Sequence, residues 1–431
     1  MKYALLSSVI VIVILLSSIE FSSIAKADVK AETIAVDDDI VDMINQINEE
    51  LVFSYHDALM SFGPRYTGSI NCTLAGNYIY NEFQKMDLEV HFHDWSYRGF
   101  HSRNIIATLH GTDPSSNAII IMSAHYDCTP GSLGADDDGS GVAAVLAAAN
   151  IMSDYSFNHT IRFIAFSGEE VGLCGSFCYA RNAYENGDNI YAVINLDMVG
   201  YADTPEGGKL IRFFHPERSH WIAEYAYEVS EQYYDIVDML VEPRPNYPGA
   251  DHQAFVDYGY DGVWIAHRDG YPWANSPEDT PDHINHTYQV KATKLLLAVV
   301  AELADDPIEI QIVLKTPYEG YYYFFDTPLI KNFLGRKWYM GLRGITVIFG
   351  RAVASAEVYC NEDIENVVFC IDDCFIYWDA EAPYEWKIQG KQMGIIGKHK
   401  LKVYAYSTSG LEATDEMDIR IFTLSCQYGK W

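Results

Sequence analysis

Six side chains that could bind a metal ion or transfer a proton follow, or lie between, short apolar segments of this chain. They are His125, Asp127, Asp137, Glu169, Glu170 and Asp197. Carboxylates that come close together repel one another and raise one another's pKa unless a cation compensates their charge. A mixed set of imidazole and carboxylate ligands suits zinc, with manganese and cobalt as alternatives. The sequence therefore predicts a metal centre.

The adjacent pair Glu169 and Glu170 adds catalysis to this prediction. Two zinc ions about 3.5 to 4 Å apart can hold a carbonyl oxygen and a nucleophilic water together. Successive side chains of an extended chain point to opposite sides, so one glutamate can bind metal while the other stays free as a general base. This arrangement is typical of a metal-dependent hydrolase.

Buried strands that alternate with helices are expected to position these residues. The predicted strands cover 89–95, 103–110, 118–124, 160–167, 191–196 and 262–266, and the predicted helices cover 39–62, 75–86, 141–152, 219–234 and 287–303. Such alternation predicts an α/β fold with a mostly parallel, mixed sheet covered by helices on both faces. Ligands gather outside the carboxyl ends of the strands in such sheets. The six side chains should therefore meet at one edge.

Seven segments between Phe62 and Leu303 resemble those of a known enzyme family. They are Gly63-Pro64-Arg65-Tyr66-Thr67-Gly68-Ser69, Ser123-Ala124-His125-Tyr126-Asp127, 134–141, 166–175, Asn195-Leu196-Asp197-Met198, Ala250-Asp251-His252 and Ser276-Pro277-Glu278-Asp279-Thr280. Together they make the chain similar to the secreted di-zinc aminopeptidases, which also include glutamate carboxypeptidase-like and glutaminyl cyclase-like relatives. The resemblance implies a zinc exopeptidase-like fold and metallo-aminopeptidase activity.

The resemblance also implies a role for each of the six side chains. Asp137 would bridge two zinc ions, and His125 and Asp197 would complete one of the two sites. Glu170 would bind the other zinc. Glu169 would be the general base that takes a proton from the bridging water and later protonates the leaving amine. Asp127 would orient His125 without touching the metal, as expected beside a metal-bound histidine.

The chain departs from the family at the last metal ligand. The family has a histidine in the context His-Thr/Ser-x-x-Asp-Thr, whereas this chain has Asn275 at that position. An amide oxygen can coordinate a divalent cation, but it is a neutral and harder ligand than imidazole. The hypothesis is that the second zinc is weakly held or exchangeable, or that His283, His286 or His267 takes the place of Asn275.

Three regions are expected along the chain. Residues 1–27 combine a positive start, an apolar run and a small-residue ending, which predict a cleaved signal peptide. Residues 28–306 form the predicted zinc peptidase domain. Strand-like segments at 344–349, 352–359, 365–377, 399–407 and 416–424 predict a smaller all-β, immunoglobulin-like sandwich over residues 307–431. The sequence does not indicate a ligand for this accessory domain.

Charge and composition limit the partners of this protein. The formal net charge of −31 repels nucleic acid and anionic membrane surfaces. No segment after the signal peptide is long and apolar enough to cross a bilayer, so the mature chain is not expected to be an integral membrane protein. The eight cysteines divide equally between the two halves, and export permits disulfides within each half. We expect a secreted, extracellular protein.

The predicted function is a zinc-dependent exopeptidase. The preferred form is an aminopeptidase that hydrolyses N-terminal residues from peptides with a metal-bound water activated by Glu169. One alternative is a single-metal relative of the glutaminyl cyclase or carboxypeptidase type. The other is a degenerate peptidase fold used for binding, which the loss of the last histidine would favour.

Overall fold

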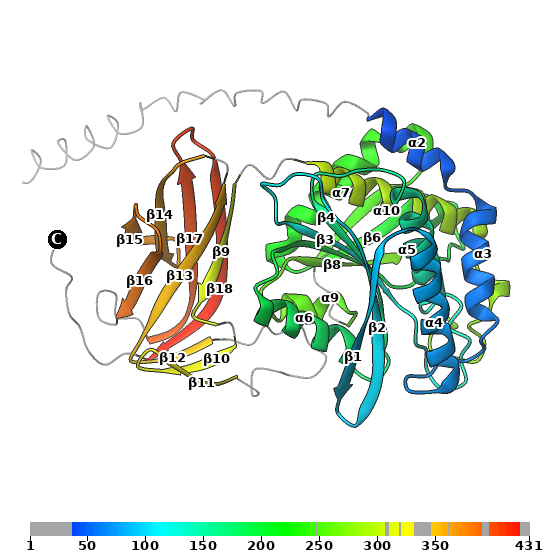
Figure 1. Cartoon of the computed structure of the whole chain (residues 1–431), viewed down its shortest axis with the longest axis horizontal. Coiled ribbons are helices and arrows are strands. Elements are labelled where there is room, and N and C mark those ends of the chain that lie inside the picture. The colour runs from blue at the N-terminus through cyan, green and yellow to red at the C-terminus, as the bar shows by residue number, and fades with distance from the viewer. Residues whose placement is uncertain are drawn as a thin grey trace, which may run out of the picture. The chain divides into compact units, whose positions relative to one another are not determined.

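The computed structural model describes residues 37–245, 249–306, 310–318, 320–331, 346–360, 362–389 and 396–422. The predicted signal peptide lies outside the described residues, so its prediction is not tested. Figure 1 shows an α/β part, which contains the six candidate site residues, and a β part nearer the C-terminus.

A mixed eight-stranded sheet forms the centre of the α/β part (Figure 1). Its strand order is β1-β2-β4-β3-β5-β8-β6-β7. In chain order the strands are β1 (Glu89–Tyr97), β2 (Phe100–Leu109), β3 (Ile119–His125), β4 (Thr160–Phe166), β5 (Ile190–Leu196), β6 (Leu210–His215), β7 (Leu240–Pro245) and β8 (Gly262–His267). The central strands β4, β3, β5 and β8 run parallel, and β2 and β6 flank them in the antiparallel sense. The predicted mostly parallel, mixed sheet is confirmed.

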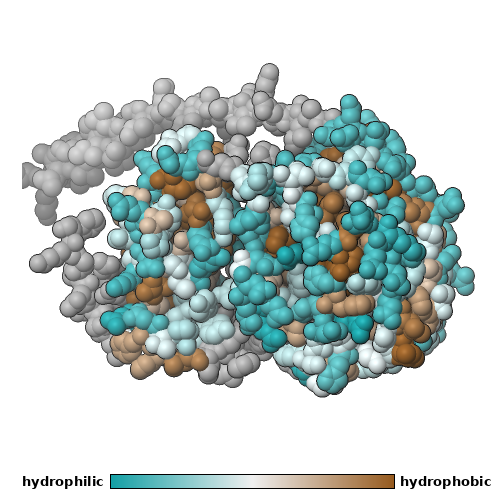
Figure 2. Space-filling view, viewed as in Figure 1, coloured by the Kyte–Doolittle hydropathy of each residue, from teal (hydrophilic) through white to brown (hydrophobic). Residues whose placement is uncertain are grey.

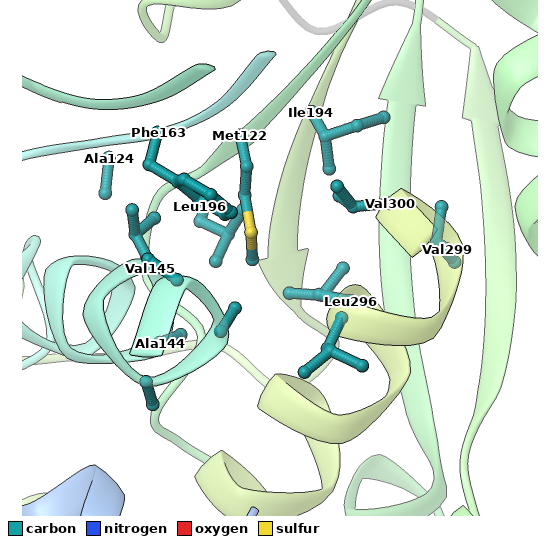
Figure 3. Packing of buried hydrophobic residues seen from close by; sticks show 14 of the residues in the cluster. Met122, Ala124, Ala144, Val145, Phe163, Ile194, Leu196, Leu296, Val299 and Val300 are labelled. Atoms are coloured by element: carbon teal, nitrogen blue, oxygen red, sulfur yellow. The ribbon is translucent and has the colours of Figure 1, made fainter. Parts of the chain in front are cut away.

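Helices cover both faces of this sheet. They are α2 (Asp38–Gln46), α3 (Glu49–Met60), α4 (Ile70–Lys85), α5 (Gly139–Met152), α6 (Cys174–Asn186), α7 (His220–Gln232), α8 (Tyr234–Val237), α9 (His252–Val256) and α10 (His286–Asp305). Alternate residues of β3 divide between the two faces. Met122 packs in a cluster with residues of α5 and α10 (Figure 3), whereas Ile121 packs with residues of α6 and α9. Strand periodicity of two thus places one helix layer on each side.

Helix α5 has a buried side chain at nearly every position. Its sequence is rich in alanine and valine and has no charged residue, so it can lie between β3 on one side and α3 and α10 on the other. The side chain of Asp138 caps its N-terminus by accepting the amide of Gly141 at 3.0 Å.

Several elements differ from the prediction. The single helix expected over 39–62 is two helices, α2 and α3, because Asn48 is extended and caps α3 by accepting the amide of Leu51. Helices α6 and α9 and strands β6 and β7 were not predicted. Strand β6 alternates buried and half-buried residues and β7 is mostly half-buried, so neither has the continuous apolar run of the central strands.

Two sheets form the β part. In chain order its strands are β9 (Ile310–Thr316), β10 (Tyr321–Phe324), β11 (Thr327–Lys331), β12 (Thr346–Phe349), β13 (Arg351–Cys360), β14 (Ile364–Ile371), β15 (Cys374–Asp379), β16 (Tyr384–Gln389), β17 (Ile396–Ser407) and β18 (Glu412–Phe422). One sheet has seven strands and the other has three. A single apolar cluster contains residues of both sheets, so the predicted β-rich sandwich is confirmed.

One predicted strand of the sandwich is a hairpin. The segment 365–377 turns at Asp372 and Asp373, which have φ values of 48° and 63°. Two successive residues with positive φ are typical of a tight hairpin turn, and aspartate tolerates this conformation better than most residues.

The described residues bear on two further predictions, the absence of a membrane-spanning segment and the presence of disulfides. Within the described ranges, no helix is both long and apolar enough to cross a bilayer. The seven cysteines of the described part are all free thiols, so the predicted disulfides are not found among them. Cys426 lies outside the described residues.

Candidate metal centre

Three neighbouring parallel strands deliver the candidate ligands to one edge of the sheet. His125 is the last residue of β3, Asp197 follows β5 directly, and Glu169 and Glu170 follow β4 after a short turn. Asp137 lies in the turn just before α5. The edge predicted from the strand pattern is therefore the edge at which these residues meet.

His125 lies at the centre of this group. Its Nε2 atom is 3.3 Å from Oδ1 of Asp137 and 3.8 Å from Oδ1 of Asp197. Zinc lies about 2.0 to 2.2 Å from nitrogen and oxygen ligands, so two of its ligand atoms lie about 3.3 Å apart in a tetrahedral site. All three side chains are almost completely buried. The distance from Nε2 to Asp137 matches the spacing of ligand atoms in a tetrahedral zinc site, and the distance to Asp197 is slightly longer.

The other ring nitrogen of His125, Nδ1, faces away from these ligands and contacts Asp127. Nδ1 is 3.1 Å from the backbone carbonyl oxygen of Asp127 and 3.7 Å from its carboxylate. A hydrogen on Nδ1 donates to that carbonyl, which leaves the lone pair of Nε2 directed toward Asp137 and Asp197. Asp127 therefore contacts His125 chiefly through its main chain, and its role in orienting a metal-bound histidine stays a prediction.

The carboxylate of Asp127 also accepts two hydrogen bonds. Its Oδ2 atom accepts the hydroxyl of Thr67 at 2.5 Å, and its Oδ1 atom accepts the backbone amide of Glu169 at 3.3 Å. Asp127 thus connects His125, at the end of β3, to the turn that carries Glu169, the predicted general base. This link was not evident from the sequence.

Three successive aspartates occupy the turn before α5, and their hydrogen bonds distinguish them. His125, Asp138 and Asp197 have ligand-type atoms within 4.8 Å of one another. However, the two oxygens of Asp138 accept the backbone amides of His125, Met198 and Gly141. Its carboxylate is therefore already occupied by main-chain donors, which leaves Asp137 as the better ligand.

Asp136 is also structural. Its Oδ1 atom accepts the amide of Gly200 at 2.8 Å, and its Oδ2 atom lies 2.9 Å from Nε2 of His267. Asp136 and Asp138 are both fully buried. Their hydrogen bonds fix the turn on both sides of Asp137.

The site is crowded with carboxylates, and their pKa values reflect this. Burial and the negative charge of Asp137 raise the pKa of Glu170 to about 9. Burial, with Asp197 and Asp251 nearby, raises the pKa of Glu169 well above its usual value. Burial lowers the pKa of His125, but the carboxylates of Asp127, Asp137 and Asp197 outweigh it and hold that pKa well above its usual value. A bound cation would relieve this repulsion.

Two of the proposed metal ligands each have a buried atom without a hydrogen-bond partner in the described part of the chain. These atoms are Nε2 of His125 and Oε1 of Glu170. Buried polar atoms normally have partners, and unpaired ones mark strain, a catalytic role or an ion. The donor set of one imidazole and several carboxylates fits zinc. The residues present therefore fit the metal that the family resemblance implies.

Asn275 is exposed in the turn between β8 and α10 and has a positive φ of 56°. Its place as a metal ligand remains a prediction. Of the histidines considered as substitutes, His267 has both ring nitrogens engaged, with Asp136 at 2.9 Å and the carbonyl of Asp269 at 2.7 Å. His283 stacks on Trp273, and His286 stacks on Phe53. His267 would have to give up one of these contacts to bind metal, whereas stacking leaves the ring nitrogens of His283 and His286 outside the ring contact.

Arg65 is a structural residue of the site that the sequence analysis did not assign. Its guanidinium is fully buried and donates to the carbonyls of Tyr126, Leu133 and Gly134 at 2.8, 2.6 and 3.0 Å. It thereby holds the loop between β3 and the aspartate turn. The sequence did contain an indication of this role, because Arg65 belongs to the first family-like segment, Gly63-Pro64-Arg65-Tyr66-Thr67-Gly68-Ser69.

Asp251 belongs to the family-like segment Ala250-Asp251-His252. Its carboxylate is fully buried at the start of α9, so it does not line an open surface. Burial raises its pKa to about 7, and its negative charge in turn raises the pKa of Glu169. Structural and electrostatic support of the site is the better description.

Comparison with known proteins agrees with this geometry. The sequence pattern of peptidase family M28 matches residues 104–300, a segment that contains the six clustered side chains. This segment is similar to peptidase family M28. The predicted resemblance to metallo-aminopeptidases is thus confirmed.

The M28 relatives include aminopeptidases from bacteria and fungi. Aminopeptidase YwaD of Bacillus subtilis is 30% identical over 217 residues, which are 47% of this chain and 44% of YwaD. The chain thus spans less than half of YwaD. Leucine aminopeptidase 1 of Phaeosphaeria nodorum is 26% identical over 298 residues, which cover 62% of this chain and 73% of that protein.

Solved structures share the fold. The structure of BSAP, a zinc aminopeptidase from Bacillus subtilis, has a TM-score of 0.54 and 17% identity, and covers 60% of this chain and 96% of that chain. At this identity the likeness concerns the fold alone.

Proposed function

We propose that this protein is a zinc-dependent exopeptidase, and more specifically an aminopeptidase that removes N-terminal residues from peptides. The observation that carries the proposal is the buried cluster of His125, Asp137 and Asp197 beside the two glutamates that follow β4. The M28 relatives described above are aminopeptidases, which supports this activity over the cyclase and carboxypeptidase alternatives.

His125, Asp137, Asp197 and Glu170 would hold the metal, and Asn275 is the proposed remaining ligand. Bound zinc supplies a Lewis acid that polarises the scissile carbonyl and makes a bound water more acidic. The substitution of asparagine for histidine favours a second zinc that is weakly held.

Glu169 would act as the general base. Its carboxylate takes a proton from the attacking water and returns that proton to the nitrogen of the leaving amine. Burial raises the pKa of Glu169 well above its usual value, so it can retain the proton between these two transfers. Asp127 holds the backbone of Glu169 and so sets the direction from which the carboxylate approaches.

Selectivity for a free N-terminus would follow from charge. The site gathers several carboxylates, and a cationic α-amine is attracted to such a region. We also propose that the protein is secreted, because residues 1–27 have the pattern of a cleaved signal peptide.

Release of a chromophore from aminoacyl anilides tests this function. We expect cleavage of a leucine anilide, loss of cleavage with a chelator and recovery with added zinc. The same anilide with an acetylated amine should not be cleaved. Cleavage of the blocked substrate would contradict the exopeptidase assignment.

Assays with other substrates separate the alternatives. Conversion of N-terminal glutamine without anilide cleavage would support the cyclase type. Zinc binding without turnover on aminoacyl anilides, glutaminyl peptides or C-terminal residues would support the degenerate binding fold, for which the loss of histidine at position 275 is the supporting observation.

A further inference from the structure

Asp279 makes an unusual contact with the turn that carries Asp137. Its Oδ1 atom accepts the backbone amide of Asp136 at 2.9 Å, and its Oδ2 atom accepts the backbone amide of Asp137 at 3.2 Å. Asp279 is fully buried and lies far along the chain, in the turn between β8 and α10. One carboxylate therefore binds two successive amides of the proposed metal-bridging segment.

We infer that Asp279 is a positioning residue of the metal centre, which sets where Asp137 presents its carboxylate by binding the amides of Asp136 and Asp137. It touches neither substrate nor metal. The inference rests on the proposed metal site, but not on the identity of the peptide that is cleaved.

The hydrogen-bond geometry suits a carboxylate at this position. The two buried N–H groups bind different oxygens of Asp279, and an ionised carboxylate offers both as acceptors. Asparagine of the same shape offers one oxygen and one NH2 group, so one amide would face a donor. A buried donor left without an acceptor is strongly unfavourable, and the turn would shift to satisfy it.

Other contacts make the position of Asp279 well defined. The hydroxyl of Tyr271 donates to its Oδ1 atom at 2.7 Å. The neighbouring side chains of the turn are fixed independently, since Asp136 is held by His267 and Gly200. A displacement of Asp279 would therefore act on Asp137, whose carboxylate is not tied to those partners.

Asp269 offers a matched control. A single oxygen of its carboxylate, Oδ2, accepts two successive amides, those of Asp203 and Thr204, at 2.9 and 2.7 Å. That loop does not carry a proposed metal ligand. Asp269→Asn therefore removes the same charge from a side chain that binds two successive amides, while its one amide oxygen can still accept both.

The test is the zinc affinity of the full-length protein, measured by competition with a chromophoric chelator, with circular dichroism as a check of folding. Asp279→Asn should bind zinc about 10- to 100-fold more weakly, as is typical when a group supporting a ligand is lost. Asp269→Asn should keep the wild-type affinity. Tyr271→Phe, which keeps both amide bonds, should have a smaller effect than Asp279→Asn.

A folded Asp279→Asn variant with wild-type zinc affinity would overturn the inference. If that variant does not fold, Asp279→Glu keeps the charge and both oxygens but is one methylene longer, and unchanged zinc affinity in it would overturn the inference equally. In the wild-type protein, hydrogen exchange at the amides of Asp136 and Asp137 should be slow, and rapid exchange would also contradict it.

The outcomes separate this inference from the proposed function. Wild-type protein that binds zinc without cleaving anilides would remove the peptidase assignment and leave the role of Asp279 intact. Wild-type protein that binds no zinc would remove both. Active wild-type protein with an unaffected Asp279→Asn variant would remove only the inference.

Discussion

His125 and Glu169 are joined through a single residue, Asp127. The main-chain carbonyl of Asp127 is 3.1 Å from Nδ1 of His125, and its carboxylate accepts the amide of Glu169. The ligand and the proposed base are therefore held relative to each other by one residue. At this scale the chemistry depends on which carboxylates are already hydrogen-bonded and which are free.

Glu169→Gln should remove turnover while leaving the metal centre intact. The amide cannot accept the proton of water, and loss of a general base typically costs about 10²- to 10⁴-fold in rate. We expect zinc content and the circular dichroism spectrum to stay unchanged. Glu185→Gln, at an exposed position of α6, serves as the control. Retained turnover in Glu169→Gln would contradict the proposed mechanism.

Asn275→His should strengthen binding of the second zinc. Imidazole is a better zinc ligand than a neutral amide, and histidine is among the residues that tolerate the positive φ of this position. Zinc titration followed by calorimetry would show a tighter second step. Asn186→His adds a histidine at an exposed position elsewhere as a control. Two tightly held zinc ions both in wild type and in Asn275→Ala would contradict the weak-site hypothesis.

At the scale of elements, the site depends on loops that are held by distant segments. The loop after β3 is clamped by Arg65, which precedes α4, and the turn before α5 is held by Asp279, which follows β8. Gly134 has a φ of 58°, and a Cβ atom there would lie 2.7 Å from Cβ of Cys128 and 3.0 Å from Nη2 of Arg65. The nearest atom would be the backbone carbonyl oxygen of Asp137 at 2.5 Å, so the packing of this loop requires glycine.

Arg65→Lys should destabilise the protein although the charge is kept. Lysine cannot reproduce the fork of donors that reaches three carbonyls, and hydrogen bonds to charged groups contribute about 1.5 to 3 kcal/mol each. We expect the free energy of unfolding in urea to fall by about 3 kcal/mol or more. Arg181→Lys, on a partly exposed side chain of α6, should change it little. Equal stability of both variants would refute the clamp.

At the scale of the whole molecule, negative charge is both concentrated inside and distributed outside. The formal net charge is −31, and hydrophilic residues cover much of the face shown in Figure 2. Inside, the carboxylates of the metal centre repel one another. The stability of the metal-free protein should therefore depend on pH in a direction set by these buried groups.

The metal-free protein should become less stable between about pH 7 and 9. Burial and the charge of Asp137 raise the pKa of Glu170 from its ordinary 4.5 to about 9, so the folded chain binds more protons than the unfolded chain over this interval. The free energy of unfolding then falls as pH rises. The interval begins near 7 because buried histidines such as His252, whose pKa burial lowers to about 3, act in the opposite sense at lower pH.

Thermal melting across this pH range measures the effect. Zinc should reduce the slope, because a bound cation keeps Glu170 ionised in the folded state. Metal-free Glu170→Gln should also have a shallower slope. A melting temperature that rises with pH in the chelated wild type would contradict this account.

The sequence alone was sufficient for the central sheet and for the set of clustered acids. Ile119, Ile120 and Ile121 form a continuous apolar run because a parallel central strand is buried on both faces, and the polar residues that follow such runs necessarily reach one edge. Strands β6 and β7 lack that pattern and were missed.

Only the tertiary structure decided which of three adjacent aspartates is free to bind metal. Asp136, Asp137 and Asp138 are chemically identical in the sequence, and their roles differ because His267, Asp279 and the amide of Met198 reach them from remote segments. Hydrogen-bond partners that are distant along the chain leave no local pattern, so the division between structural and ligand carboxylates exists only in the folded molecule.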